Sequence, residues 1–303
     1  MEVREGTIAF PLDGEEASTW YRVTGELRPG DAAAPAPLVV LHGGPGAAHD
    51  YLLTLTDLAA ERAVVHYDQL GNGRSTHFPG RGADFWTVDL FVRELRNLVQ
   101  ELGIACRHHV LGQSWGGFLA QEYALTQPPG LRALVLADTA ASFPDFVAEA
   151  NRLRALLPPE VDETLRRHEE ASTTDDPEYA AACQVFYRRH LCRIDPWPEE
   201  VGEAFAWIER DPTVYHTMNG PSEFHVVGSI KDWQSKDRLG GIHVPTLVVS
   251  GRHDEATPAL QETLRQGIPN AEWICFEESS HMPHVEERER FMRVVGAFLA
   301  RHD

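Results

Sequence analysis

One short stretch, residues 111–117 with the sequence LGQSWGG, limits the possible folds of this chain more than any other. An apolar run, residues 109–111, precedes it, and a helix-forming run, residues 118–124, follows it. Gly112 and Gly116 let a strand and a helix approach closely around Ser114, because a Cβ at either position would clash. A turn of this kind lifts the serine hydroxyl clear of the backbone and points the first free N–H groups of the helix at whatever the serine attacks. On its own the pattern also fits a turn without chemistry, so the rest of the chain must supply partners.

The remaining pattern predicts an α/β fold. Continuous apolar runs indicate buried strands, and they alternate with segments of helical periodicity, which is typical of a mostly parallel sheet covered by helices on both faces. The expected strands are residues 38–41, 63–67, 131–138, 244–250 and 273–276, and the expected helices are residues 87–102, 258–266 and 285–301. Two alternating segments, residues 7–10 and 19–23, predict an N-terminal hairpin with a turn at Asp13-Gly14.

Residues 142–239 interrupt this alternation. They are rich in charged and helix-forming residues and contain no short run of Val, Ile or Leu. We interpret them as a mainly helical lid inserted into a core formed by residues 1–141 and 240–303. A chain of 303 residues is long enough for one large domain with such an insertion.

Charge and cysteine content exclude several kinds of partner. The net charge of −19 argues against nucleic acids and anionic membranes. No apolar run approaches the roughly 20 residues of a membrane span, and the first residues show no signal peptide. The four cysteines are scattered and form no CxxC pair, so neither disulfides nor a zinc site is expected, and a reducing cytoplasm is the expected location.

Downstream residues could activate Ser114. A serine nucleophile needs a base to take its proton and a carboxylate to orient that base, and in one recurrent order the acid and then the histidine follow the serine, each after a strand. Asp254 follows the strand expected at residues 244–250, and His281 follows the strand expected at residues 273–276. His284 is an alternative base and Asp138 an alternative acid, and we favour Asp254 and His281.

An oxyanion also needs N–H donors, each worth about 10²–10³ in rate. The backbone N–H of Trp115, directly after the serine, is one expected donor. The other is expected from Gly44 in the glycine-rich loop at residues 42–46. The loop at residues 68–75 and His42 are expected to have structural roles.

Three motifs together resemble the proline iminopeptidase family of α/β-hydrolases, and the resemblance covers the whole chain. A fourth, the lid sequence at residues 215–224 together with residues 228–233, is similar to the branch that contains the tricorn-interacting aminopeptidase and L-amino-acid amidases. In that branch the residues that match Glu223 and Glu255 bind the free α-amine of the substrate, and the tyrosine that matches Tyr215 lines the site. The lid departs from strictly proline-selective members, which favours a broader choice of N-terminal residue. The first three motifs are His42-Gly43-Gly44-Pro45-Gly46, Asp68-Gln69-x-Gly71-x-Gly73-x-Ser75 and Gly112-Gln113-Ser114-Trp115-Gly116-Gly117.

The resemblance implies a serine aminopeptidase that releases N-terminal residues from short peptides, amides or arylamides through an acyl-enzyme, without a metal or organic cofactor. A small substrate with a free amino terminus would be its partner. The alternatives are an esterase, amidase or acyltransferase of the same fold in a biosynthetic pathway, and a non-catalytic ligand sensor. The preferred side chain, the physiological substrate and the oligomeric state stay open.

Overall fold

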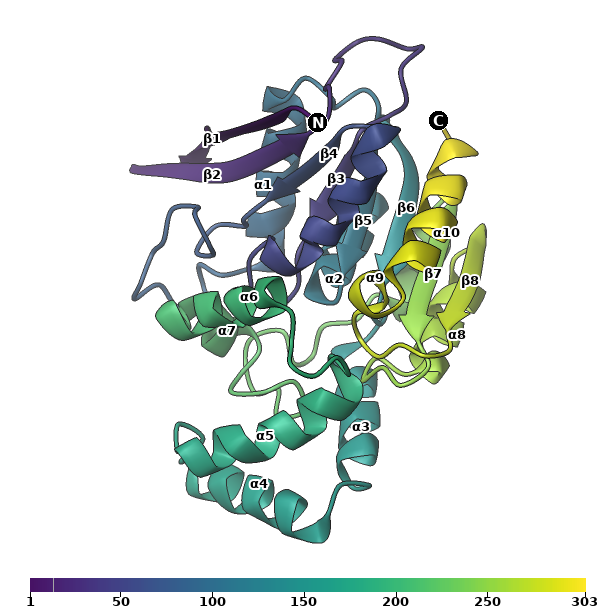
Figure 1. Ribbon diagram of the computed structural model, residues 1–303. Coiled ribbons are helices and arrows are strands. Elements are labelled where there is room, and N and C mark those ends of the chain that lie inside the picture. Colours follow the sequence, from purple (N-terminus) through teal and green to yellow (C-terminus); the bar gives the residue numbers. More distant parts are fainter. Residues whose placement is uncertain (13) are drawn as a thin grey trace.

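A twisted sheet of eight strands forms the centre of the computed structural model, which describes residues 1–12 and 14–303 (Figure 1). The strand order is β1-β2-β4-β3-β5-β6-β7-β8. β1 and β2 pair antiparallel, β2 also runs antiparallel to β4, and all other neighbours are parallel. The strands are β1 (Val3–Leu12), β2 (Glu15–Thr24), β3 (Leu38–Leu41), β4 (Val64–Tyr67), β5 (His108–Gln113), β6 (Leu131–Ala137), β7 (Thr246–Gly251) and β8 (Ala271–Phe276).

Helices cover both faces of the sheet, as the sequence predicts. Successive residues of a strand point to opposite faces, and β3 shows the result: Val39 and Leu41 belong to one apolar core, and Leu38 and Val40 belong to the other. The first core contains α1 (Val88–Glu101), α2 (Trp115–Leu125) and α8 (Pro258–Gly267). The second contains η1 (Asp50–Ala60) and α10 (Arg288–Ala300). Burial on both faces explains why these strands read as continuous apolar runs.

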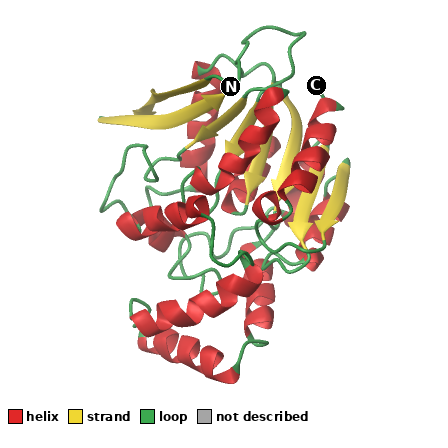
Figure 2. Cartoon of the chain, in the orientation of Figure 1, coloured by secondary structure: helices red, strands yellow, loops and turns green. Residues whose placement is uncertain are grey.

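The segment between β6 and β7 is helical and stands at the carboxyl ends of the parallel strands (Figures 1 and 2). Ser142 caps the first of its helices by accepting a hydrogen bond from the N–H of Asp145. A bridge between Ser142 and Gln234 brings the two ends of the segment together. Its elements are α3 (Phe143–Arg154), α4 (Pro159–Ala171), α5 (Pro177–His190), α6 (Glu199–Arg210), α7 (Thr213–Met218) and η2 (Lys236–Gly241).

The structure differs from the sequence prediction in its details. The helix predicted over residues 285–301 is divided into α9 (Pro283–Glu286) and α10 at Glu287, whose carboxylate accepts hydrogen bonds from the Glu278 N–H at 3.1 Å and the Ser279 hydroxyl at 2.7 Å. The short helices η1 and η2 were not predicted. The N-terminal hairpin of β1 and β2 is longer than predicted. Asp13, in its predicted turn, lies outside the described residues. Among the described residues, no helix combines the length and the apolar character needed to cross a bilayer.

Candidate active site

Ser114 lies in the sharp turn between β5 and α2. Its backbone has φ 55° and ψ −123°, a combination that a residue other than glycine adopts only under strain. A Cβ on Gly112 would lie 2.1 Å from the Gly116 carbonyl oxygen, and one on Gly116 would lie 2.1 Å from the Leu41 carbonyl oxygen. Both glycines are therefore required by the closeness of strand and helix, and the turn has the geometry predicted from its spacing.

Asp254 and His281 meet at the same edge of the sheet, in the loops after β7 and β8. His281 donates a hydrogen bond from Nδ1 to Asp254 Oδ1 at 2.6 Å, and Asp254 Oδ1 also accepts the Ala256 N–H at 2.8 Å. Both side chains are buried. With its proton on Nδ1, the imidazole keeps Nε2 available as a base.

Ser114 and His281 line one cavity. No hydrogen bond between the two side chains is formed within the described residues, and such contacts commonly tighten only when substrate binds. The structure thus brings together the serine, histidine and aspartate that the sequence singles out.

The two alternative residues are engaged elsewhere. His284 donates from Nε2 to the Tyr51 carbonyl oxygen at 3.2 Å, and burial lowers its pKa to about 3, so it stays neutral. Asp138 accepts the Gly251 N–H at 3.2 Å. Burial and then the neighbouring Asp254 raise the Asp138 pKa well above its usual range, which leaves Asp138 protonated.

Two backbone N–H groups beside the nucleophile have no partner among the described residues. The N–H groups of Gly44 and Trp115 donate no hydrogen bond to any described residue, whereas the Gly43 N–H donates to the Tyr51 hydroxyl at 2.7 Å. Gly44 has φ +114°, a conformation that favours glycine. Helix α7 packs against this loop, because a Cβ on Gly46 would lie 2.7 Å from the Tyr215 Cβ. The expected oxyanion donors are thus free to bind a ligand.

Two carboxyl groups line the same cavity. Glu223 accepts a hydrogen bond from the Tyr215 hydroxyl at 2.6 Å. Glu255 is fully buried, and neither of its oxygens has a hydrogen-bond partner among the described residues. Its Oε1 lies 3.8 Å from His281 Nε2, which is too far for a hydrogen bond. Glu223 and Glu255 thus line the cavity of Ser114, whereas Tyr215 is not among its described lining residues and contacts Glu223 and Gly46 instead.

Both carboxyl groups hold protons more tightly than usual. Burial raises the pKa of Glu223. Burial, followed by the charges of Glu223 and Asp254, raises the pKa of Glu255 well above its ordinary value. Because an unpaired buried carboxyl group is costly, this arrangement favours a bound cation.

Other residues of the cavity were not predicted. Tyr51 from η1 and Gln113 from β5 form part of its wall, and α6 provides its roof. Gln113 stands inside the predicted motif, whereas the sequence around Tyr51 gives no comparable signal. The cavity holds about 40 Å³, and its apolar lining includes Leu191, Ala204, Phe205, Ile208 and Met282.

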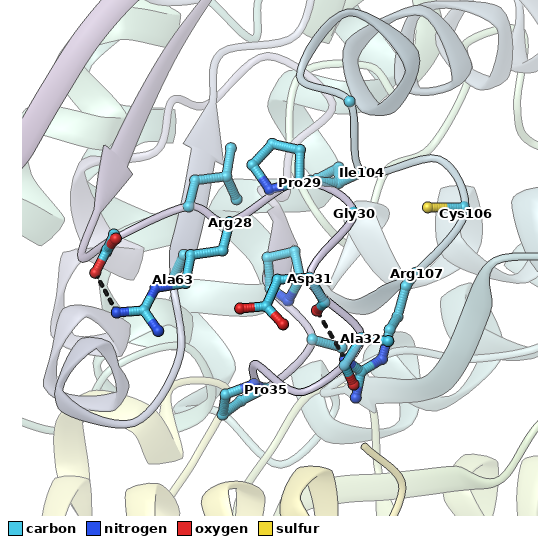
Figure 3. A pocket seen from close by; sticks show the side chains of 15 residues that line it. Arg28, Pro29, Gly30, Asp31, Ala32, Pro35, Ala63, Ile104, Cys106 and Arg107 are labelled. Carbon is cyan, nitrogen blue, oxygen red and sulfur yellow. Dashed lines mark hydrogen bonds and ion pairs between the residues drawn. The ribbon is translucent and has the colours of Figure 1, made fainter.

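A larger cavity of about 200 Å³ is lined by residues that include Pro29, Asp31 and Arg107 (Figure 3). Its walls include Ala63 and Ile104, which precede β4 and β5, so it opens at the amino ends of the strands. Arg107 in its wall donates to the Ala32 carbonyl oxygen at 2.9 Å. None of the candidate catalytic residues lines this cavity.

Comparison with known proteins gives consistent results. The family model described as the alpha/beta hydrolase fold matches residues 36–288. The proline iminopeptidase of Heyndrickxia coagulans is 39% identical over 269 residues, which cover 87% of this chain and 90% of that protein. The crystal structure of VinJ is 52% identical with a TM-score of 0.93 and covers 98% of this chain and 99% of that chain. The crystal structure of a proline iminopeptidase from Mycobacterium smegmatis is 45% identical with a TM-score of 0.88 and covers 98% of both chains.

Proposed function

Because the chain belongs to the proline iminopeptidase family of α/β-hydrolases, we propose that it is a serine aminopeptidase. It releases N-terminal amino acids from short peptides, amides or arylamides through an acyl-enzyme. The observation that carries this proposal is the pair of carboxyl groups, Glu223 and Glu255, in the cavity of Ser114. Of these, Glu255 is buried with both oxygens unpartnered among the described residues.

The chemical step follows from the hydrogen bonds. His281 takes the proton of the Ser114 hydroxyl, and the serine oxygen attacks the carbonyl carbon of the first residue. The N–H groups of Gly44 and Trp115 stabilise the oxyanion of the tetrahedral intermediate. His281 then returns the proton to the leaving amine, and Asp254 keeps the imidazole oriented and stabilises its charged form. Water repeats the sequence and releases the free amino acid.

Recognition of the chain end is electrostatic. A terminal ammonium group placed between Glu223 and Glu255 gains charge-assisted hydrogen bonds and neutralises two groups that are otherwise poorly compensated. Tyr215 holds Glu223 in place through its 2.6 Å hydrogen bond. The position of the cleaved bond is then measured from the amino terminus of the substrate. Residues 142–239 serve as the lid that encloses the bound amino terminus.

The setting of the enzyme follows from the chain's chemistry. Its four cysteines are free, which supports a reducing cytoplasmic compartment. Its net charge of −19 supports a small cationic substrate rather than a nucleic acid or an anionic membrane. The mechanism assigns no step to a metal or an organic cofactor.

A comparison of amino-acid arylamides with their N-acetylated forms tests the proposal. We expect hydrolysis of the free-amine substrates, and a panel of them identifies the preferred side chain. Acetylation of the substrate, or the E255Q substitution, should lower kcat/KM by an amount equivalent to about 2–5 kcal/mol of transition-state stabilisation. E209Q, which removes the same charge from the exposed surface of α6, is the matched control and should behave like the wild type. Equal rates on free and acetylated substrates would contradict the proposal and favour an esterase, amidase or acyltransferase.

A further inference from the structure

Two buried polar side chains beside the nucleophile take no part in the chemical steps above. Tyr51 belongs to η1, and Gln113 is the last residue of β5, directly before Ser114. Tyr51 and Gln113 are 4% and 1% exposed, and both line the cavity. The mechanism proposed above assigns a chemical step to neither of them. Buried polar groups in a cavity wall need a reason to be there.

The hydrogen bonds of Tyr51 and Gln113 form one continuous series, called here the hydrogen-bond chain. The Gly43 N–H donates to the Tyr51 hydroxyl oxygen at 2.7 Å, and the Tyr51 hydroxyl donates to Gln113 Oε1 at 2.5 Å. Gln113 Nε2 then donates to the His281 carbonyl oxygen at 2.9 Å. The chain begins in the loop at residues 42–46 and ends on the backbone of the histidine.

The direction of this chain is fixed by its ends. A peptide N–H can only donate and a carbonyl oxygen can only accept, so the tyrosine must accept from Gly43 and the amide must donate to His281. If the Gln113 amide were reversed, its oxygen would face the His281 carbonyl oxygen, and the tyrosine hydroxyl would lose its acceptor. Burial raises the pKa of Tyr51 far above its usual value, so the hydroxyl keeps its proton.

We propose that Tyr51 and Gln113 act as one positioning unit that holds the oxyanion loop, residues 42–46, and His281 in register with Ser114. This inference rests on the proposed function, because it assigns catalytic roles to both ends of the chain. Fixing the Gly43 peptide fixes the next N–H, that of Gly44. The packing leaves little slack, since a Cβ on Gly43 would lie 2.9 Å from the Tyr51 hydroxyl and 3.0 Å from the Ser114 Cβ.

A double-mutant cycle with Y51F and Q113M tests the unit. Each variant roughly keeps the side-chain volume. Y51F removes the hydrogen bonds of Tyr51 to Gly43 and Gln113, and Q113M removes those of Gln113 to Tyr51 and His281, so the bond between the two residues is lost in either variant. We expect each to lower kcat about 10–100-fold, because catalysis is sensitive to displacements of about 1 Å, with KM within about 3-fold of the wild type. If the residues act together, the double variant should be within about 3-fold of the weaker single variant. If the reduction in kcat of the double variant equals the product of the two single-variant reductions, the proposal is overturned.

A matched control separates positioning from stability. Gln261 on α8 is also fully buried, and its Nε2 donates to the Thr139 and Ala256 carbonyl oxygens, both at 2.7 Å. Q261M should lower the Tm about as much as Q113M while kcat stays within about 2-fold of the wild type. If Q261M lowers kcat as strongly as Q113M at equal Tm, the effect is one of stability and the positioning unit is refuted.

A second readout keeps the test independent of the substrate. The rate at which a fluorophosphonate labels Ser114 depends on the same base and oxyanion donors but requires no amine. The labelling rates should show the same non-additive pattern in the cycle. If this pattern appears while no arylamide is hydrolysed, the aminopeptidase proposal fails and the positioning unit stands. If labelling is unchanged in both single variants, the unit is refuted.

Discussion

Two aspartates at the ends of neighbouring strands have different surroundings. Asp254 accepts hydrogen bonds from His281 Nδ1 and from the Ala256 N–H. Asp138 has the Gly251 N–H at 3.2 Å, but burial and the charge of Asp254 raise its pKa well above the usual range. Each aspartate keeps one oxygen without a hydrogen-bonded donor among the described residues. A shared proton between the two carboxyl groups would satisfy both oxygens.

This difference predicts unequal effects of removing the charge. D138N should keep kcat within about 3-fold of the wild type, because asparagine can still donate toward Asp254 in place of the protonated acid. D254N should lower kcat about 10⁴-fold, because the wrong tautomer of the histidine is then favoured. Steady-state kinetics with an arylamide and the rate of Ser114 labelling by a fluorophosphonate measure both effects. A D138N variant as inactive as D254N would show that Asp138 is needed in its charged form.

The raised pKa values of Glu223 and Glu255 predict how amine binding depends on pH. Only the ionised carboxyl groups attract an ammonium group, and their raised pKa values move ionisation to a pH above the ordinary glutamate value of about 4.3. Affinity for an amino alcohol should therefore increase as the pH rises above that ordinary value. The inhibition constant is the measurement, and the matched N-acetylated alcohol is the control. A constant that does not change with pH between 5 and 7 would contradict the ionisation of either group on binding.

The strands and the motifs beside them were predictable because local sequence determines them. Val39 and Val40 face opposite cores, so the strand had to be apolar throughout, and a run of this kind is visible without a structure. The turn at Ser114 was predictable because only glycine fits at Gly112 and Gly116. Glu287 ends a helix that the periodicity would continue, because its side chain binds residues 278 and 279, and a contact of that kind has no local signal.

Tertiary burial also hides residues whose type suggests the surface. Glu94 of α1 is fully buried and accepts hydrogen bonds from the Thr19 hydroxyl at 2.5 Å and the Leu70 N–H at 3.0 Å. Neither partner is near it in the sequence, so helical periodicity alone could not identify this link between α1, β2 and the loop after β4. The same holds for Tyr51, which reaches the oxyanion loop only in the folded chain.

Glu94 predicts a dependence of stability on pH. Burial raises its pKa to about 8, so the folded state binds its proton more tightly than the unfolded state. The stability it contributes is complete below the unfolded value of about 4.3 and is lost as the pH rises through about 8. E94Q should remove this loss. The Tm of the variant minus the Tm of the wild type should therefore be more positive at pH 8.5 than at pH 5.

Thermal unfolding across this pH range measures the effect. E101Q, at an exposed position at the end of the same helix, is the control and should follow the wild-type curve. Parallel curves for E94Q and the wild type from pH 5 to 9 would mean that Glu94 does not bind a proton preferentially in the folded state.

At the scale of the whole molecule, polar contacts join α6 and the residue after it to the core. Trp207 of α6 donates from Nε1 to Asp50 Oδ2 of η1 at 3.1 Å, and His77 Nδ1 lies 2.6 Å from Asp211 Oδ2. The same helix α6 supplies Ala204, Phe205 and Ile208 to the roof of the cavity. Contacts that hold α6 down therefore also determine how well the substrate is enclosed.

We expect W207F to loosen this roof while leaving the chemistry intact. Losing one hydrogen bond to a charged group costs about 1.5–3 kcal/mol at most, and binding weakens by the fraction of molecules in which the roof is open. KM for an arylamide should rise about 3–10-fold with kcat within about 2-fold, and limited proteolysis should cut residues 142–239 faster. E209Q on the exposed face of α6 should change neither quantity. A fall in kcat with an unchanged KM would show instead that α6 acts on the catalytic groups, because an open roof reduces the occupied fraction of the enzyme and saturating substrate restores it.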